Sequence, residues 1–189
     1  MEEAKILDNN SKKNLETSLG AQWICMGAGW SLFFGYEAMG WSKDPDHCWA
    51  SDQSDFPVPG VNAGDAEGVV DVGERFSIIF TICYYAAITI FAMGVLHCIP
   101  LKPIRLVSRA LATLASQLMN ITLFVAIIFR LMHTGQVCSG DFVEGDESKS
   151  GYLVSQGFLL LLLIYIYLAI CGIVCFLGIM AMMVKCLTG

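Results

Sequence analysis

Residues 158–184 read FLLLLLIYIYLAICGIVCFLGIMAMMV, a run without a single charged side chain. A helix in a soluble bundle would interrupt such a run with polar residues at a period near 3.6. Three further apolar blocks precede it, at about 20–40, 76–99 and 106–132. Because a helix needs roughly 20 apolar residues to cross a bilayer core, each block can span a membrane.

The sequence therefore predicts an all-α membrane protein, a four-transmembrane-helix bundle. Its 56% hydrophobic content and mean hydropathy of +0.62 agree with this class. We expect an N-terminal arm at 1–17 and a membrane domain at 18–189. Within that domain, helices are expected at about 18–40, 75–99, 104–133 and 152–187, with longer connections at 41–74 and 134–151.

Basic residues are distributed unequally between the two sides of this bundle. The side that holds the termini and the short 100–106 turn carries most of them: Lys5, Lys12, Lys13, Lys102, Arg105, Arg109 and Lys185. Because basic residues stay in the cytosol, both termini are expected there, and the two longer loops face outside. Thirteen of the seventeen carboxylates, from Glu37 to Glu147, then lie on the outer side. An integral protein of the plasma membrane or of another membrane derived from the secretory pathway is expected.

Two of the eight cysteines, Cys48 and Cys138, lie in the expected outer loops, away from the apolar segments and their edges. Outer loops face an oxidising compartment, where disulfides persist. We predict a disulfide between Cys48 and Cys138, with two free or intermolecular thiols as the alternative. Closing so long a loop stabilises the fold by roughly 4–5 kcal/mol in the chain-entropy description.

Arg130 lies inside the third apolar block, where an unpaired guanidinium is costly. Glu37 is at a comparable depth near the outer end of the first helix, and Glu74 borders the second. We predict an intramembrane ion pair between Glu37 and Arg130.

Small and polar residues recur at helical spacing in the first and third helices. The first carries Gly27, Ser31 and Gly35 at i, i+4 and i+8, a ridge that lets another backbone approach closely. A stripe of small and polar residues marks the third, at Ser108, Ala112, Ser116 and Asn120, beside Thr113 and Gln117. Interhelical packing through Ser116 and Asn120 is expected, with a pore or polar cavity as the alternative.

Four aromatic residues that are costly to leave in water lie in the acidic outer loops: Trp41, Trp49, Phe56 and Phe142. A small outer region conceals only a limited fraction of its surface, so some of these rings are expected to contact another subunit. Carboxylates of the first outer loop could bind calcium, but the spacing of a calcium-binding loop does not occur.

Catalytic motifs are not apparent, and the three histidines are dispersed along the chain. We expect no enzyme activity, cofactor or metal centre, although bound lipids are expected. The acidity of the chain, with a formal net charge of −6, argues against nucleic-acid binding.

In helix count and orientation the chain resembles the general tetraspan group, which includes claudins, tetraspanins and MARVEL-type proteins. Its first outer loop has no W…GLW…C…C arrangement, its second has no CCG, and each loop holds one cysteine. The expected function is that of a structural or accessory tetraspan protein, which assembles laterally with itself or within a larger membrane complex. The alternative is an oligomeric ion channel or small-solute transporter that uses the polar stripe of the third helix.

Overall fold

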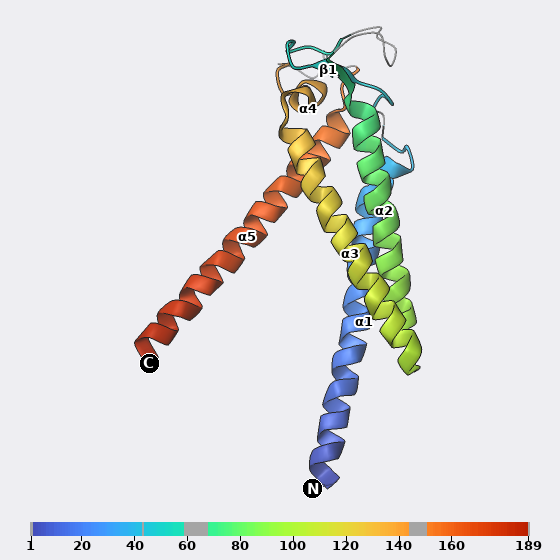
Figure 1. Cartoon of the computed structure of the whole chain (residues 1–189), viewed down its shortest axis with the longest axis vertical. Coiled ribbons are helices and arrows are strands. Elements are labelled where there is room, and N and C mark those ends of the chain that lie inside the picture. The colour runs from blue at the N-terminus through green and yellow to red at the C-terminus, as the bar shows by residue number, and fades with distance from the viewer. Residues whose placement is uncertain (1, 43, 59–67, 144–150, 189) are drawn as a thin grey trace. The chain divides into compact units, whose positions relative to one another are not determined.

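The computed structural model describes residues 2–42, 44–58, 68–143 and 151–188. Parts of both expected outer loops, 59–67 and 144–150, lie outside the described residues. The chain is mostly helical, as predicted. Its elements follow in the order α1 (Glu2–Ala38), β1 (Trp49–Ser51), β2 (Val69–Asp71), α2 (Val72–His97), α3 (Lys102–Leu131), α4 (His133–Cys138) and α5 (Val154–Thr188) (Figure 1).

The first helix begins much earlier than the sequence pattern indicated. We expected a helix from about residue 18, preceded by an arm at 1–17, whereas α1 is helical from Glu2. Leu, Lys and Glu recur in this segment, and these residues have high intrinsic helix propensity. A polar segment can therefore extend a helix without contributing to its apolar face.

Three short elements occupy segments that we expected to be connecting loops. Strands β1 and β2 pair antiparallel, with Ala50 opposite Val70, and the backbone N–H of Val58 donates to the Trp49 carbonyl at 2.8 Å. Helix α4 lies within the second expected loop. Strands of three residues and a helix of six are too short to show a hydrophobic period.

Among the described residues, two helices are long and apolar enough to cross a membrane, α2 and α3. Helix α5 contributes a shorter apolar stretch, Val154–Ile170. Large apolar side chains are exposed along all three helices, among them Tyr85, Leu114 and Phe158. Extended apolar surface of this kind is rare on soluble monomers, and together with a disulfide it is consistent with a secretory-pathway membrane protein.

The chain forms two compact units, and each has its own packing. The first comprises Met1–His47 and Gly73–Ala126, which hold α1, most of α2 and most of α3. The second comprises Cys48–Val72 and Ile127–Gly189, with the hairpin, α4 and α5.

In the first unit, α1 and α2 run antiparallel in close contact. Gly27 faces the backbone of Phe91, and a Cβ atom on Gly94 would lie only 2.8 Å from the Ile24 nitrogen. Only glycine permits so close an approach of two helix backbones. Of the three small residues predicted to admit a neighbouring helix, Gly27 and Gly35 thus face α2 of the same chain. Ser31 is half-buried, and its hydroxyl donates to the Ala28 carbonyl at 2.9 Å.

Where α2 turns into α3, the buried His97 connects three helices. Its Nδ1 lies 3.1 Å from the Ser108 hydroxyl of α3, and its ring meets Trp23 of α1 edge-on with centroids 5.1 Å apart. The start of α3 is therefore fixed against both α1 and α2.

Candidate functional site

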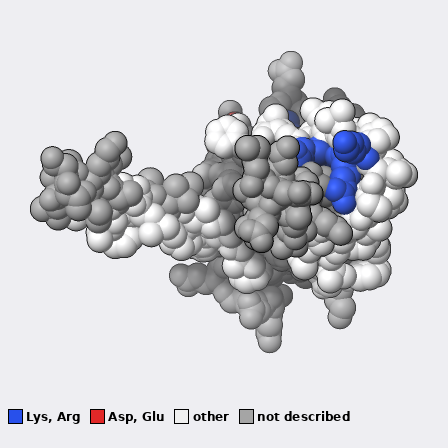
Figure 2. Space-filling view, turned by 90° about the horizontal axis from the view of Figure 1, so that it is seen from below, with Lys and Arg blue, Asp and Glu red and all other residues white. Residues whose placement is uncertain are grey.

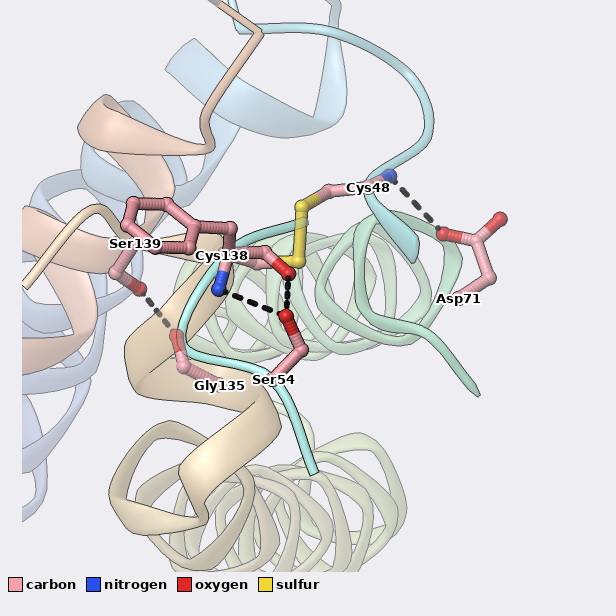
Figure 3. Close-up of a disulfide and its surroundings, with 7 residues drawn as sticks. Cys48, Ser54, Asp71, Gly135, Cys138 and Ser139 are labelled. Atoms are coloured by element: carbon pink, nitrogen blue, oxygen red, sulfur yellow. Dashed lines mark hydrogen bonds between the residues drawn. A yellow bond between two sulfur atoms is a disulfide. The ribbon is translucent and has the colours of Figure 1, made fainter. Parts of the chain in front are cut away.

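The second unit contains the predicted disulfide. Cys48 precedes β1 and Cys138 ends α4, and their sulfur atoms are bonded with the Cα atoms 5.9 Å apart (Figure 3). Both residues are buried. We call the described residues of 48–72, 127–143 and 151–157 the clamped lobe, since the bond joins segments separated by 90 positions in the sequence.

Backbone hydrogen bonds extend this clamp on both sides. The Cys48 N–H donates to the Asp71 carboxylate at 3.3 Å, which secures the hairpin, as Figure 3 shows. On the other side, the Leu153 N–H donates to the Cys138 carbonyl at 2.7 Å, so the start of α5 is held against α4. The disulfide therefore lies within a hydrogen-bonded network.

Close packing of α4 against α5 requires a glycine. The Ser139 side chain fits against Gly157, where any added Cβ would collide with it. The Ser139 hydroxyl donates to the Gly135 carbonyl at 2.7 Å, which satisfies it away from water.

Arg130 at the end of α3 is buried in this lobe, and it binds a different carboxylate from the one we expected. Its two terminal nitrogens each donate to an oxygen of Asp141 at 2.8 Å, and its Nε donates to the Gly157 carbonyl at 3.0 Å. The expected pair with Glu37 is therefore not the ion pair that the structure gives Arg130. Arg130 pairs with Asp141 because the bend at α4 returns the chain to the end of α3. This bend places the Asp141 carboxylate in bidentate geometry with the guanidinium.

Two exposed phenylalanines of the clamped lobe, Phe56 and Phe142, lie on the two segments that His133 contacts. The His133 Nε2 lies 3.2 Å from the Ser54 carbonyl and 3.5 Å from the Asp55 carboxylate, and its ring lies 5.3 Å from that of Phe142. A carbonyl can only accept, so the Nε2 carries the proton in the first of these contacts. The N–H of Phe56 donates to the Ser54 hydroxyl at 3.2 Å. We call Phe56, His133 and Phe142 the aromatic patch.

The four aromatic residues expected to make assembly contacts differ in exposure. Phe56 is 62% exposed and Phe142 is 44% exposed, so much of the aromatic patch is open. Trp41, at 65% exposure, belongs to the first unit, and Trp49 is half-buried in β1.

The polar stripe of α3 divides between two faces. Ser108 and Ala112 are buried in the first unit, Ser116 is half-buried, and Asn120 is exposed. Thus the first half of the predicted stripe belongs to the core. Sequence periodicity alone could not separate a small residue that packs inside from a polar residue that points outward.

A second series of residues on α3 forms a polar face that we did not recognise as continuous. Thr113 and Gln117 are one turn apart and both exposed, and Asn120 follows three positions later. The same face continues towards the start of α3 through Arg109 and Arg105. The i+3 and i+4 spacing of this face was visible in the sequence. We used Arg105 and Arg109 only to predict the orientation of the chain in the membrane and did not connect them with the polar residues that follow.

Among the described residues, no group of three or more His, Cys, Asp or Glu side chains gathers as a metal site would require. Cys25, Cys83 and Cys98 are free thiols, and Cys83, on α2, is buried in the apolar core. A buried thiol in apolar surroundings behaves as a small hydrophobic group.

No protein-family model matches the sequence, and neither a curated protein nor a solved structure is significantly similar to it.

Proposed function

We propose that this chain is a four-span membrane protein with a structural role, which assembles laterally through the polar face of α3 and the aromatic patch. Support for spanning comes first from the charges of α3. No charged residue lies between Arg109 and Arg130, and that stretch of helix is about 30 Å long at ~1.5 Å per residue. A bilayer hydrocarbon core has about the same thickness.

Packing and composition support two further spans in this proposal. Helix α1 runs beside α2 from Gly20, next to Cys98, to Phe34, whose ring centroid lies 6.1 Å from that of Phe80. If α2 crosses the membrane, α1 crosses with it over the same depth. Helix α5 carries the apolar stretch Val154–Ile170, and its sequence remains free of charge as far as Val184.

The observation that carries the assembly proposal is Gln117, an amide exposed in the middle of a helix apolar enough to cross a membrane. Lipid chains offer no hydrogen-bond partner, so a polar side chain in a span must face protein or water. Polar side chains that hydrogen-bond between membrane helices contribute about 1 kcal/mol each to association. A neighbouring helix on the Gln117 face satisfies this requirement without a water-filled path.

Cysteine cross-linking in a lipid bilayer tests this proposal. The experiment starts from a variant in which serine replaces every cysteine except Cys48 and Cys138. Gln117→Cys is compared with Leu118→Cys, a matched control because the two positions are adjacent, both exposed and about 100° apart around α3. We expect a bifunctional thiol reagent to link Gln117→Cys into a defined larger species and to leave Leu118→Cys monomeric.

The same variants separate assembly from conduction. A membrane-impermeant thiol reagent should react slowly at positions 116, 117 and 120 if they face another helix. Rapid modification at all three, with protection at Leu118→Cys, would instead show a water-lined face and favour the channel or transporter. Equal cross-linking at 117 and 118 would show that α3 has no preferred face and would overturn the assembly proposal.

A further inference from the structure

One face of α3 carries exposed residues at the spacing of a coiled coil. They follow one another in steps of three, four, three and four positions: Ala110, Thr113, Gln117, Asn120 and Phe124. An average step of about 3.5 residues keeps one row of side chains facing a neighbouring helix along its whole length. We call these five residues the α3 seam.

The α3 seam points away from the packed side of its own helix. Ala112, Ala115 and Met119 are buried in the first unit. At about 100° per residue, these three positions lie roughly opposite Gln117 around the helix axis. The packing of α3 within its unit therefore leaves the seam exposed.

The seam lies in the part of α3 that is proposed to cross the hydrocarbon core. It falls inside the uncharged stretch between Arg109 and Arg130, and Gln117 is ~12 Å along the helix from the first and ~20 Å from the second at ~1.5 Å per residue. At that depth a polar side chain finds hydrogen-bond partners on protein rather than on lipid.

The polar residues of the seam can bond to residues of their own kind. The amides of Gln117 and Asn120 each contain a donor and an acceptor. The Thr113 hydroxyl donates to the Arg109 carbonyl at 2.9 Å, and its oxygen can still accept. Charged residues would need a different surface of opposite charge, whereas amides at the same level on two identical helices complement each other. The chemistry of the seam thus fits a second copy of itself.

The orientation of the two copies follows from how a chain inserts. The same distribution of basic residues directs every copy, so all copies have the same orientation in the membrane. Two α3 helices then meet in parallel, and a two-fold axis along the membrane normal brings each seam residue opposite its own counterpart. We propose that the partner on the Gln117 face is α3 of a second copy, with the two Gln117 amides bonded to each other. This inference rests on the proposed function, since it requires α3 to span the membrane.

Positive charge at the start of α3 sets one end of the contact. Lys102, Arg105 and Arg109 line a pocket there, and Figure 2 shows Lys and Arg side chains gathered in one patch. Arg109 directly precedes the seam and flanks it. In a parallel pair, flanking positions of the two copies lie on opposite sides of the two-fold axis, so Arg109 faces the region of Leu114 on the second copy. The close contact therefore begins beyond Arg109.

Disulfide scanning in a lipid bilayer tests the seam. In the variant that retains only Cys48 and Cys138, single cysteines replace residues 110–124 one at a time, and copper phenanthroline oxidises them. We expect cross-linking at the five seam positions to be at least about tenfold faster than at the control positions 111 and 118, which are exposed on another face. Equal rates at seam and control positions would overturn the seam.

Co-expression of two differently tagged copies identifies the partner. We expect the product of Gln117→Cys to carry both tags and to have the mass of two chains. A product that joins Gln117→Cys to a different protein would overturn this inference and leave the proposed lateral assembly in force. No product with copper phenanthroline or with the bifunctional reagent would overturn both.

Gln117→Leu isolates the contribution of the amide. With Ala110→Cys as the reporter, we expect Gln117→Leu to slow cross-linking by about fivefold or more and Gln117→Asn to retain most of the rate. Leu118→Ala is the matched control and should leave the rate unchanged. Thermal unfolding establishes that each variant is folded, as expected for substitutions at exposed positions. An unchanged rate in folded Gln117→Leu would overturn the amide pair.

Discussion

At the scale of single residues, Arg130 and Asp141 form the ion pair whose loss should cost most in the clamped lobe. Arg130 is 3% exposed, while the Asp141 side chain is 39% exposed, which weakens the pair through solvent screening. We expect Asp141→Asn to destabilise the protein by about 2–3 kcal/mol, since it leaves a buried guanidinium without a counter-charge. Thermal unfolding in detergent measures this.

A double-mutant cycle isolates the pair. Arg130→Gln, Asp141→Asn and their combination should show a coupling energy of at least about 1 kcal/mol, because both single variants remove the same interaction. Asp52→Asn, an exposed carboxylate of the same lobe, is the matched control and should be nearly neutral. Additive effects of Arg130→Gln and Asp141→Asn would contradict the assignment.

The disulfide gives a second prediction at this scale. Cys48→Ser and Cys138→Ser should each destabilise the protein, by as much as about 4–5 kcal/mol in the chain-entropy description. Because each variant breaks the same bond, the double variant should be no less stable than either single variant. Peptide mapping without reductant should recover the two segments as one cross-linked species. Alkylation of both thiols in the unreduced protein would contradict this prediction.

These two features show what residue patterns can and cannot predict. The disulfide was predictable because only Cys48 and Cys138 lie outside the apolar segments and their edges, which leaves a single pairing. The partner of Arg130 was not, because the prediction compared depths in a bilayer and did not consider the carboxylates of the second outer loop. Asp141 is only eleven positions from Arg130, and the turn at α4 makes that separation a direct contact.

At the scale of elements, the close contact between α1 and α2 is testable with glycine substitutions. A Cβ atom on Gly27 would collide with the Phe91 backbone, which cannot yield as a flexible side chain could. We therefore expect Gly27→Ala to lower the melting temperature markedly, by the equivalent of about 1–3 kcal/mol of overpacking strain. Thermal unfolding in detergent measures this effect.

Gly29 is the matched control for this experiment. It lies two positions away on the same helix, and nothing lies within 4 Å of the Cβ that alanine would add. Gly29→Ala should be neutral or stabilising, by up to about 1 kcal/mol, because alanine favours a helix. Equal melting temperatures of Gly27→Ala and Gly29→Ala would show that α1 does not pack on α2 in this way.

The long helices were largely predictable and the short elements were not. Helices α2 and α3 begin and end within a few residues of the boundaries expected from their apolar blocks. Strands β1 and β2 depend on pairing between segments far apart in the sequence, which no local pattern contains. The polar face of α3 was visible only in part, because core positions such as Ser108 share its composition.

At the scale of the whole molecule, exposed surfaces of two kinds support assembly. Gln117 presents an amide on an apolar helix, and the aromatic patch presents two exposed phenyl rings together with His133, whose Nε2 lies 3.5 Å from the Asp55 carboxylate. Aromatic anchors surrounded by charged groups are typical of protein interfaces. We expect chelation of calcium to affect association less than removal of these rings, because no cluster of acids forms a metal site among the described residues.

The mass of the particle in mild detergent, measured by native mass spectrometry over a range of protein concentrations, tests lateral assembly most directly. We predict a species larger than one 20.7 kDa chain, or a co-purifying partner. Phe56→Ala with Phe142→Ala should weaken association by about 2 kcal/mol or more, and Asp52→Asn should leave it unchanged. A single copy at every concentration, with no partner and no difference among these variants, would contradict the proposed function.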